Sequence, residues 1–98
     1  MKTFLVLYSQ KQSHILTDDM LNKHIYFLKK LQSDNRLSIC GPFTDNQGAV
    51  LVIMADSFME AEKIINQDPF INQKYYEKYI IHEFMTANAE NNWLCDPK

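Results

Sequence analysis

Two residues far apart in the sequence, His24 and Asp68, have the side chains needed for proton transfer. An imidazole can donate or accept a proton near neutral pH. A carboxylate that accepts a hydrogen bond from one ring nitrogen orients the ring and raises its basicity, which leaves the other nitrogen free to move a proton. If the fold brings these two residues together, they predict general acid–base chemistry.

Asp68 stands at a forced break in the backbone, because Pro69 follows it. A proline cannot continue a helix in the ordinary way, and it pushes the preceding residue out of the helical region. Proline also favours the first position of a new helix, so Asp68 has a second reading as the cap of a short turn. A carboxylate has two oxygens, and the two roles are compatible.

His24 falls on or beside an apolar stripe in the first predicted helix. Leu21, Ile25, Leu28 and Leu31 recur at helical spacing and predict the face of this helix that packs on the core. A histidine on such a face is often only a satisfied core residue. A catalytic role and a structural role for His24 therefore both remain open from the sequence.

Four further residues are expected to contact a substrate: Ser9, Gly41, Pro42 and Phe70. Ser9 ends the first predicted strand and could offer a hydroxyl to the site. Gly41 and Pro42 are expected to shape a hairpin and a wall of the pocket rather than to bind phosphate. A phosphate site would need a glycine-rich loop before a helix, and these residues do not belong to one.

The remaining histidines suggest no metal centre. His14 is expected in a solvated loop and His82 in a strand, with a structural role. Together with His24 they are too scattered to be read as a set of metal ligands. We expect neither a metal nor a cofactor.

The elements that must position these residues follow the order β-α-β-β-α-β. Alternating and apolar segments predict strands over 3–9, 37–43, 49–55 and 75–85, and capped helical segments are predicted over 18–34 and 58–66. Two right-handed crossovers then give an α+β, ferredoxin-like fold, with a four-stranded antiparallel sheet and both helices on one face. In this layout the end of the second helix, with Asp68, can reach the first helix near His24.

The other face of the sheet would be bare in a single chain. Strands carrying Val6, Val50, Val52 and Ile81 should not leave such a surface in water. Two chains packing sheet to sheet would cover it, so we expect a homodimer.

Size and composition limit the class of protein. The 98 residues are expected to form a single domain (1–98), with a core over 3–85 and a tail over 86–98. Ten basic against 12 acidic residues give a net charge of −2, without the basic footprint of a nucleic-acid binder. No apolar run is long enough to cross a membrane, and residues 4–8 are read as strand rather than secretion signal. Cys40 and Cys95 suggest reduced thiols in a cytoplasmic protein.

Several short segments together resemble the YciI-like (YCII-related) family of small proteins. The matching pieces are 24–31 (HIYFLKKL), 36–37 (RL), 40–43 (CGPF), Gly48, 60–62 (EAE) and 68–70 (DPF). The resemblance implies a dimeric α+β barrel with an active site built on a His-Asp pair, which maps onto His24 and Asp68. One departure is Asn35, where a glycine is common in the family; asparagine can take the same backbone conformation.

Two functions remain open on these grounds. The first is a cofactor-independent enzyme in which His24, oriented by Asp68, catalyses elimination or isomerisation of a small cyclic or aromatic compound, as some family members resemble lyases or dehydrochlorinases. The second is a non-catalytic dimeric module that binds a small ligand or another protein. A metal-dependent activity would need further ligands, for which the sequence has no motif.

Overall fold

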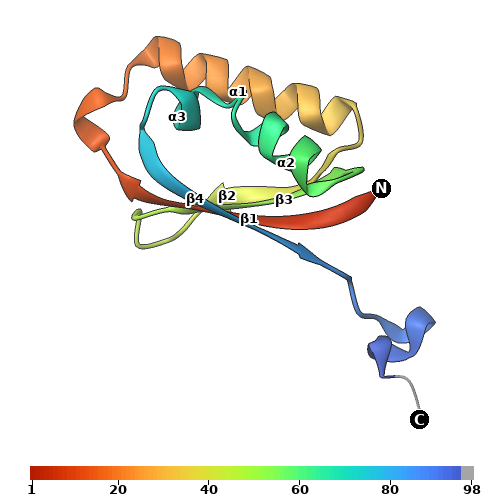
Figure 1. Ribbon diagram of the computed structural model, residues 1–98. Helices are drawn as coiled ribbons and strands as arrows, with labels where there is room; N and C mark the ends of the chain where they lie inside the picture. Colours follow the sequence, from red (N-terminus) through yellow and green to blue (C-terminus); the bar gives the residue numbers. More distant parts are fainter. Residues whose placement is uncertain (96–98) are drawn as a thin grey trace.

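The computed structural model describes residues 1–95, which form one antiparallel sheet covered by helices on one face (Figure 1). Its elements, in chain order, are β1 (Lys2–Lys11), η1 (Ser13–Ile15), α1 (Asp18–Ser33), β2 (Leu37–Pro42), β3 (Ala49–Ala55), α2 (Phe58–Ile65), α3 (Pro69–Asn72), β4 (Tyr76–Phe84) and η2 (Ala89–Leu94). The strand order is β2-β3-β1-β4, with all neighbours antiparallel. This is the predicted ferredoxin-like arrangement. Within residues 1–95, no helix is both long enough and apolar enough to span a membrane.

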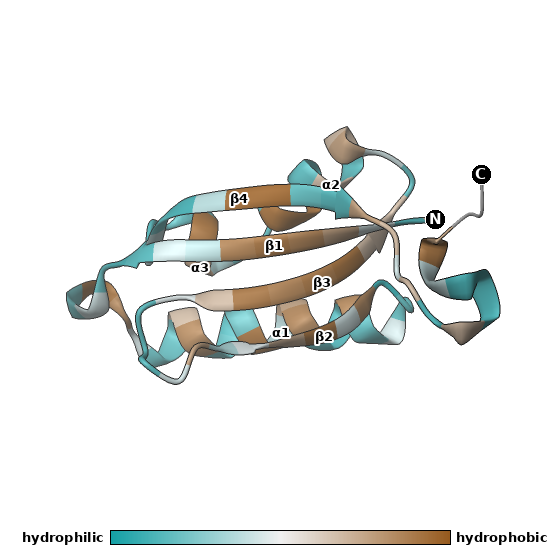
Figure 2. Cartoon of the chain, turned by 90° about the horizontal axis from the view of Figure 1, so that it is seen from below, coloured by the Kyte–Doolittle hydropathy of each residue, from teal (hydrophilic) through white to brown (hydrophobic). Residues whose placement is uncertain are grey.

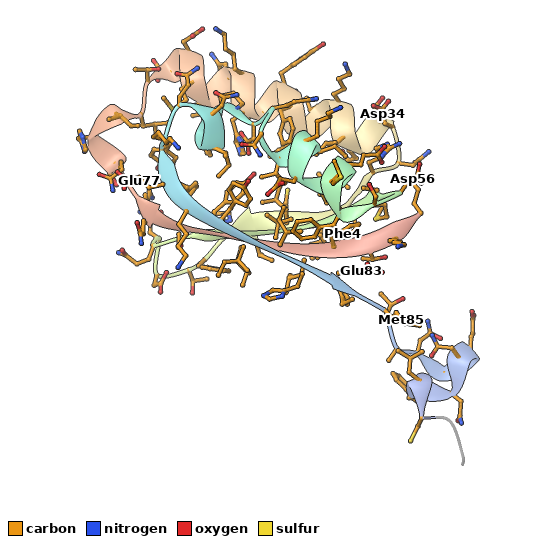
Figure 3. The ribbon with its side chains drawn as sticks, in the orientation of Figure 1. Phe4, Asp34, Asp56, Glu77, Glu83 and Met85 are labelled. Atoms are coloured by element: carbon orange, nitrogen blue, oxygen red, sulfur yellow. The ribbon has the colours of Figure 1, made fainter. Side chains whose placement is uncertain are left out.

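The core lies between the sheet and the helices. Along β1, Phe4, Val6 and Tyr8 point to this side and are at most 1% exposed. They stand opposite Ile53, Leu51 and Ala49 of β3, so one face of the two central strands is continuous apolar surface. Figure 3 labels Phe4, whose side chain lies in the layer between the sheet and the helices.

Within residues 1–95, the opposite side of the sheet carries no helix, and its residues differ in part from those predicted. Val6 and Ile81 belong to the covered face, because they pair with each other and are buried. The apolar side chains on the uncovered side, which we call the open face, are Leu5, Leu7, Ile39, Val50, Val52 and Ile80, with Met54 and Phe84 at the Thr3 end of β1. The colouring of Figure 2 shows that the hydrophobic parts of neighbouring strands lie side by side across the sheet.

The buried face of α1 is rotated from the predicted stripe. Leu31 is buried and Leu28 packs against the core as predicted, but Met20 and Phe27 are buried in place of Leu21 and Ile25, which are 37% and 39% exposed. Spacings of seven and four residues place the three buried side chains on one face, with His24 between Met20 and Phe27. His24 is therefore on the core-facing side of the helix rather than at its margin.

A β-bulge changes the predicted alternation in β2. Leu37 pairs with Ile53, but Ile39 pairs with Val52, so the register shifts by one residue between them. Ile39 then lies on the open face and is 63% exposed. Cys40, opposite the buried Leu51, is turned toward the helices instead. Simple alternation along the predicted strand 37–43 would put Leu37 and Ile39 on one face, and the bulge places them on opposite faces.

After β4 the chain leaves the sheet at Met85 and η2 projects away from the domain (Figures 1 and 3). Met85 is 70% exposed and Trp93 is 64% exposed. Asn92, Trp93 and Leu94 all have positive φ angles between 56° and 58°.

Candidate active site

His24 from α1 and Asp68 from the start of α3 meet on the covered side of the sheet. The His24 Nδ1 atom lies 2.8 Å from Asp68 Oδ1. The imidazole is 14% exposed, and the carboxylate is fully buried. The sequence-based expectation that these two residues form a pair is confirmed.

Asp68 is fixed by the helix that Pro69 begins. Its side chain caps α3 by accepting a hydrogen bond from the Phe70 backbone N–H at 3.0 Å, so the capping role also exists. The second oxygen, Oδ2, accepts from the Tyr8 hydroxyl at 2.8 Å. With His24, three groups converge on a side chain that offers only acceptors when it is ionised. The carboxylate therefore has a fixed position before any ligand arrives.

Tyr8 is the member of this network that sequence reasoning missed. It lies in an apolar strand and was counted only as part of that strand. Burial, followed by the negative charge of Asp68, raises the pKa of the Tyr8 phenol well above its usual range. The hydroxyl therefore stays protonated and continues to donate to Asp68. Alternation places Tyr8 on the same face as Phe4 and Val6, but the sequence-based expectation placed Val6 on the uncovered face, so this signal pointed away from the site.

Replacing Tyr8 by phenylalanine should lower the free energy of unfolding. It should also make that free energy depend less on pH in the alkaline range than it does in the wild type. The loss of the donor to Asp68 Oδ2 is expected to cost about 1–3 kcal/mol at neutral pH. Because the folded-state pKa of Tyr8 is raised, its contribution is complete below the unfolded value of about 10 and is lost as the pH rises beyond it. Urea unfolding between pH 8 and the alkaline limit of folding would measure both effects.

Tyr26→Phe is the matched control, because Tyr26 is 69% exposed on α1. This variant should unfold like the wild type at every pH. Equal alkaline sensitivity in Tyr8→Phe and wild type would contradict the assignment of Tyr8 to the buried network.

The ring of His24 is held by stacking. Its centroid lies 3.7 Å from that of Phe70, and the two planes are inclined by 6°. Nδ1 faces Asp68, and Nε2 has no hydrogen-bond partner within residues 1–95. Because no buried side-chain nitrogen or oxygen of the described chain lacks a partner, Nε2 must be accessible to solvent. The ring nitrogen left free by the pair is thus the one available to a ligand.

A cavity of about 410 Å³ lies beside this ring. Gly41, Pro42 and Phe70 line it, as their assignment to the substrate site requires, but Ser9 is not among its lining residues. Ser9 alternates with Tyr8 and pairs with Lys78 of β4. For comparison, a cavity of roughly 150 Å³ is enough to hold benzene.

Cys40 also lines this cavity, opposite the helix that carries His24. Burial raises the pKa of the Cys40 thiol, which favours the protonated form over the reactive thiolate. Cys40 and Cys95 are both free thiols. We therefore read Cys40 as part of the wall rather than as a nucleophile.

Lys11 and the loop after β2 border the same cavity. Lys11 Nζ donates to Asn46 Oδ1 at 2.6 Å and to the Asn46 carbonyl at 3.2 Å. The loop is held close to β1 at Gly48, where an added Cβ would lie 2.3 Å from the Tyr8 carbonyl oxygen. Only glycine fits this approach, so Gly48 brings Asn46 within reach of Lys11.

No set of metal ligands can be named in the part of the chain that the structure describes. Across residues 1–95, no three His, Cys, Asp or Glu side chains gather closely enough to hold an ion. His14 and His82 are both exposed and do not line the cavity with His24.

Comparison with known proteins identifies relatives of this chain. The family model of the YCII-related domain matches residues 1–85. The uncharacterized protein YjpA from Bacillus subtilis (strain 168) is 37% identical over 71 residues, which cover 72% of this chain and 81% of that protein. The matched residues contain His24, Asp68 and the sheet, whereas η2 lies beyond the family model.

A solved structure with the same fold contains a bound ligand. It is 5-chloro-2-hydroxyhydroquinone dehydrochlorinase (TftG) from Burkholderia phenoliruptrix AC1100, in complex with 2,5-dihydroxybenzoquinone. The TM-score is 0.72, and the match covers 92% of this chain and 99% of that one, with 20% sequence identity. At this identity, the likeness establishes the architecture.

Proposed function

The chain belongs to the YCII-related domain family, and from this premise we propose that it is a small enzyme that uses His24 for general acid–base chemistry. The substrate is a small cyclic or aromatic compound, and the reaction is an elimination or isomerisation. The observation that carries the proposal is the access of His24 Nε2 to an open cavity, while Nδ1 is held by a buried carboxylate.

In this mechanism Nε2 acts as the base. It removes a proton from a ligand carbon or hydroxyl, and the electron pair left behind forms a new double bond. The charge then leaves with a departing anion in an elimination, or is quenched by a proton returned to another carbon in an isomerisation. Asp68 orients the ring and stabilises the imidazolium that forms, while Phe70 prevents the ring from rotating.

An open cavity distinguishes this proposal from a purely structural pair. A structural His-Asp hydrogen bond needs no empty space beside it, and core side chains normally fill such space. Here the space is large enough for a substituted six-membered ring. The ligand of the similar dehydrochlorinase structure, 2,5-dihydroxybenzoquinone, is a molecule of this size and class.

A direct test is a turnover screen of chlorinated hydroquinones, phenols and small cyclic acids. Chloride release reports elimination, and exchange of ring protons with deuterated solvent reports proton abstraction without elimination. Binding of 2,5-dihydroxybenzoquinone, followed by chemical shifts of residues around His24, reports occupation of the cavity. Ligand binding at His24 without proton exchange or turnover in any compound would favour the non-catalytic binding module.

We also propose that two copies pack through the open face. Leu5, Leu7, Val50 and Val52 are half-buried in the single chain, and Ile39 and Ile80 are 63% and 39% exposed. Such a continuous apolar surface is unfavourable in water. Sheet-to-sheet packing would cover it and leave the cavity, on the helix side, within each subunit.

Replacing Leu5 by glutamate should convert the dimer to a monomer. Leu5 lies between Val52 and His82 at the centre of the open face, so a charge there would be buried between the two sheets. Analytical ultracentrifugation should give twice the chain mass for the wild type and one chain mass for this variant. Lys23→Glu on α1 is the control and should remain dimeric; a monomeric wild type would contradict the proposal.

A further inference from the structure

The cavity beside His24 is apolar but not neutral. Its lining contains no aspartate or glutamate, and Lys11 is its one permanently charged side chain. Asp68 contributes no atom to the lining, because it lies behind the imidazole, fully buried and hydrogen-bonded to three groups. A ligand entering this space therefore meets a positive charge in surroundings of low polarity, where charge is felt strongly.

Lys11 lacks a counter-ion in the described chain. Across residues 1–95, no carboxylate lies within 4.0 Å of its Nζ atom, whose hydrogen-bond acceptors both belong to Asn46. Asn46 is uncharged, and an ammonium group has three donors. The centroid of the Tyr75 ring lies 5.6 Å from Nζ, and this ring contributes only a modest cation–π attraction. Lys11 thus retains the capacity to pair with an anion.

A row of aromatic rings joins Lys11 to the imidazole. Lys11 Nζ lies over the Tyr75 ring. The Tyr75 centroid is 4.5 Å from that of Phe70, and the Phe70 ring stacks on His24 with a centroid distance of 3.7 Å. Tyr75 and Phe70 are both nearly buried and form one wall of the cavity. Lys11 and His24 therefore lie at the two ends of this row, and a ring laid against the wall would lie between them.

We propose that this cavity selects aromatic anions, with the carboxylate or phenolate of the ligand paired to Lys11 and the ring packed along Tyr75 and Phe70. This inference names the substrate class of the site proposed above and rests on that proposal. It also gives the ligand a direction, because the anionic group is fixed at the Lys11 end and the opposite edge of the ring is presented to His24. A neutral analogue of the same shape would gain the packing but lose the charge-assisted hydrogen bond.

Matched ligand pairs test this charge selection independently of turnover. Benzoate and benzamide, and 2,5-dihydroxybenzoate and 2,5-dihydroxybenzamide, differ mainly in charge, and their Kd values can be measured by NMR titration. We expect each anion to bind about 10–100-fold more tightly than its amide to the wild type. Lys11→Met keeps the length of the side chain and should abolish this preference, whereas Lys11→Arg should retain it.

Lys78→Met is the control, because Lys78 is exposed on β4 and does not line the cavity. It should bind like the wild type. The preference for anions should also persist in His24→Gln, which is expected to lose turnover. A wild type that binds anions but shows neither turnover nor proton exchange with any compound would refute the proposed enzyme and leave the charge selection standing. Equal Kd values within each pair, an unchanged preference in Lys11→Met, or no binding of any of the four ligands would overturn the inference.

Discussion

Replacing His24 by glutamine is expected to reduce kcat/KM by about 10²–10⁴-fold while the protein remains folded. The loss follows because Nε2 is the only group at the centre of the proposed mechanism that exchanges a proton with the substrate. Glutamine can still donate to Asp68 from its amide, so the buried carboxylate keeps a partner. Steady-state kinetics on the best substrate from the screen, together with thermal unfolding, would measure the two effects separately.

His14→Gln is the matched control, because His14 is an exposed histidine outside the cavity. Its kinetics should equal those of the wild type. Adding free imidazole to His24→Ala provides a second check, since the vacated space is continuous with the cavity and partial rescue is expected. A parallel loss of folded protein and activity in His24→Gln would instead assign His24 to the structural pair.

Replacing Asp68 by alanine is expected to cause the largest loss of stability of any single substitution at the site, about 3–5 kcal/mol. Three donors would lose their acceptor at once: Tyr8, His24 and the Phe70 backbone N–H. The cap of α3 would be lost with them. Because a domain of this size is stable by only roughly 5–15 kcal/mol, this variant should be close to unfolding at 37 °C. Urea denaturation would measure the change.

Asp45→Ala is the matched control for Asp68→Ala, because it removes an exposed aspartate rather than a buried one. Asp45 also accepts a backbone N–H, that of Gln47 at 2.9 Å, but it does so in an exposed turn. Its removal should cost about 1 kcal/mol or less. A comparable cost for the two aspartates would show that the buried network around Asp68 contributes little to stability.

The fold and the central pair followed from a few strong local signals. Pro69 ended one helix and began another, which placed Asp68 at a cap as the structure shows. Thr17 accepts from the Met20 N–H and Ser57 from the Glu60 N–H, as the helix starts predicted. Asn35 has a φ of 59°, the left-handed conformation inferred when it replaced the usual glycine. These features depend on neighbours in sequence, which is why they could be read from it.

What failed depended on contacts between distant segments. The stripe on α1 could be drawn through Leu21 or through Met20, and only packing against the sheet selects the second. The bulge in β2 is set by its pairing with β3 and turned Ile39 outward. Tyr8 joined the site because β1 passes beneath α3, 60 residues later in the chain. The periodicity of apolar residues alone carries no information about contacts between distant segments of the chain.

The alternation of side chains along β1 affects which substitutions this strand can accept during evolution. Tyr8 holds the carboxylate of the proposed active site, while Leu5 and Leu7, on the reverse side, belong to the surface through which copies would associate. Substitutions on the open face of β1 could therefore change how the copies associate, with little effect on the proposed catalysis. Substitutions on its covered face could change the proposed catalysis, with little effect on association. An insertion or deletion of one residue in this strand would exchange the two sets of side chains together. We expect lengths to be strictly preserved here even where the amino acids themselves diverge.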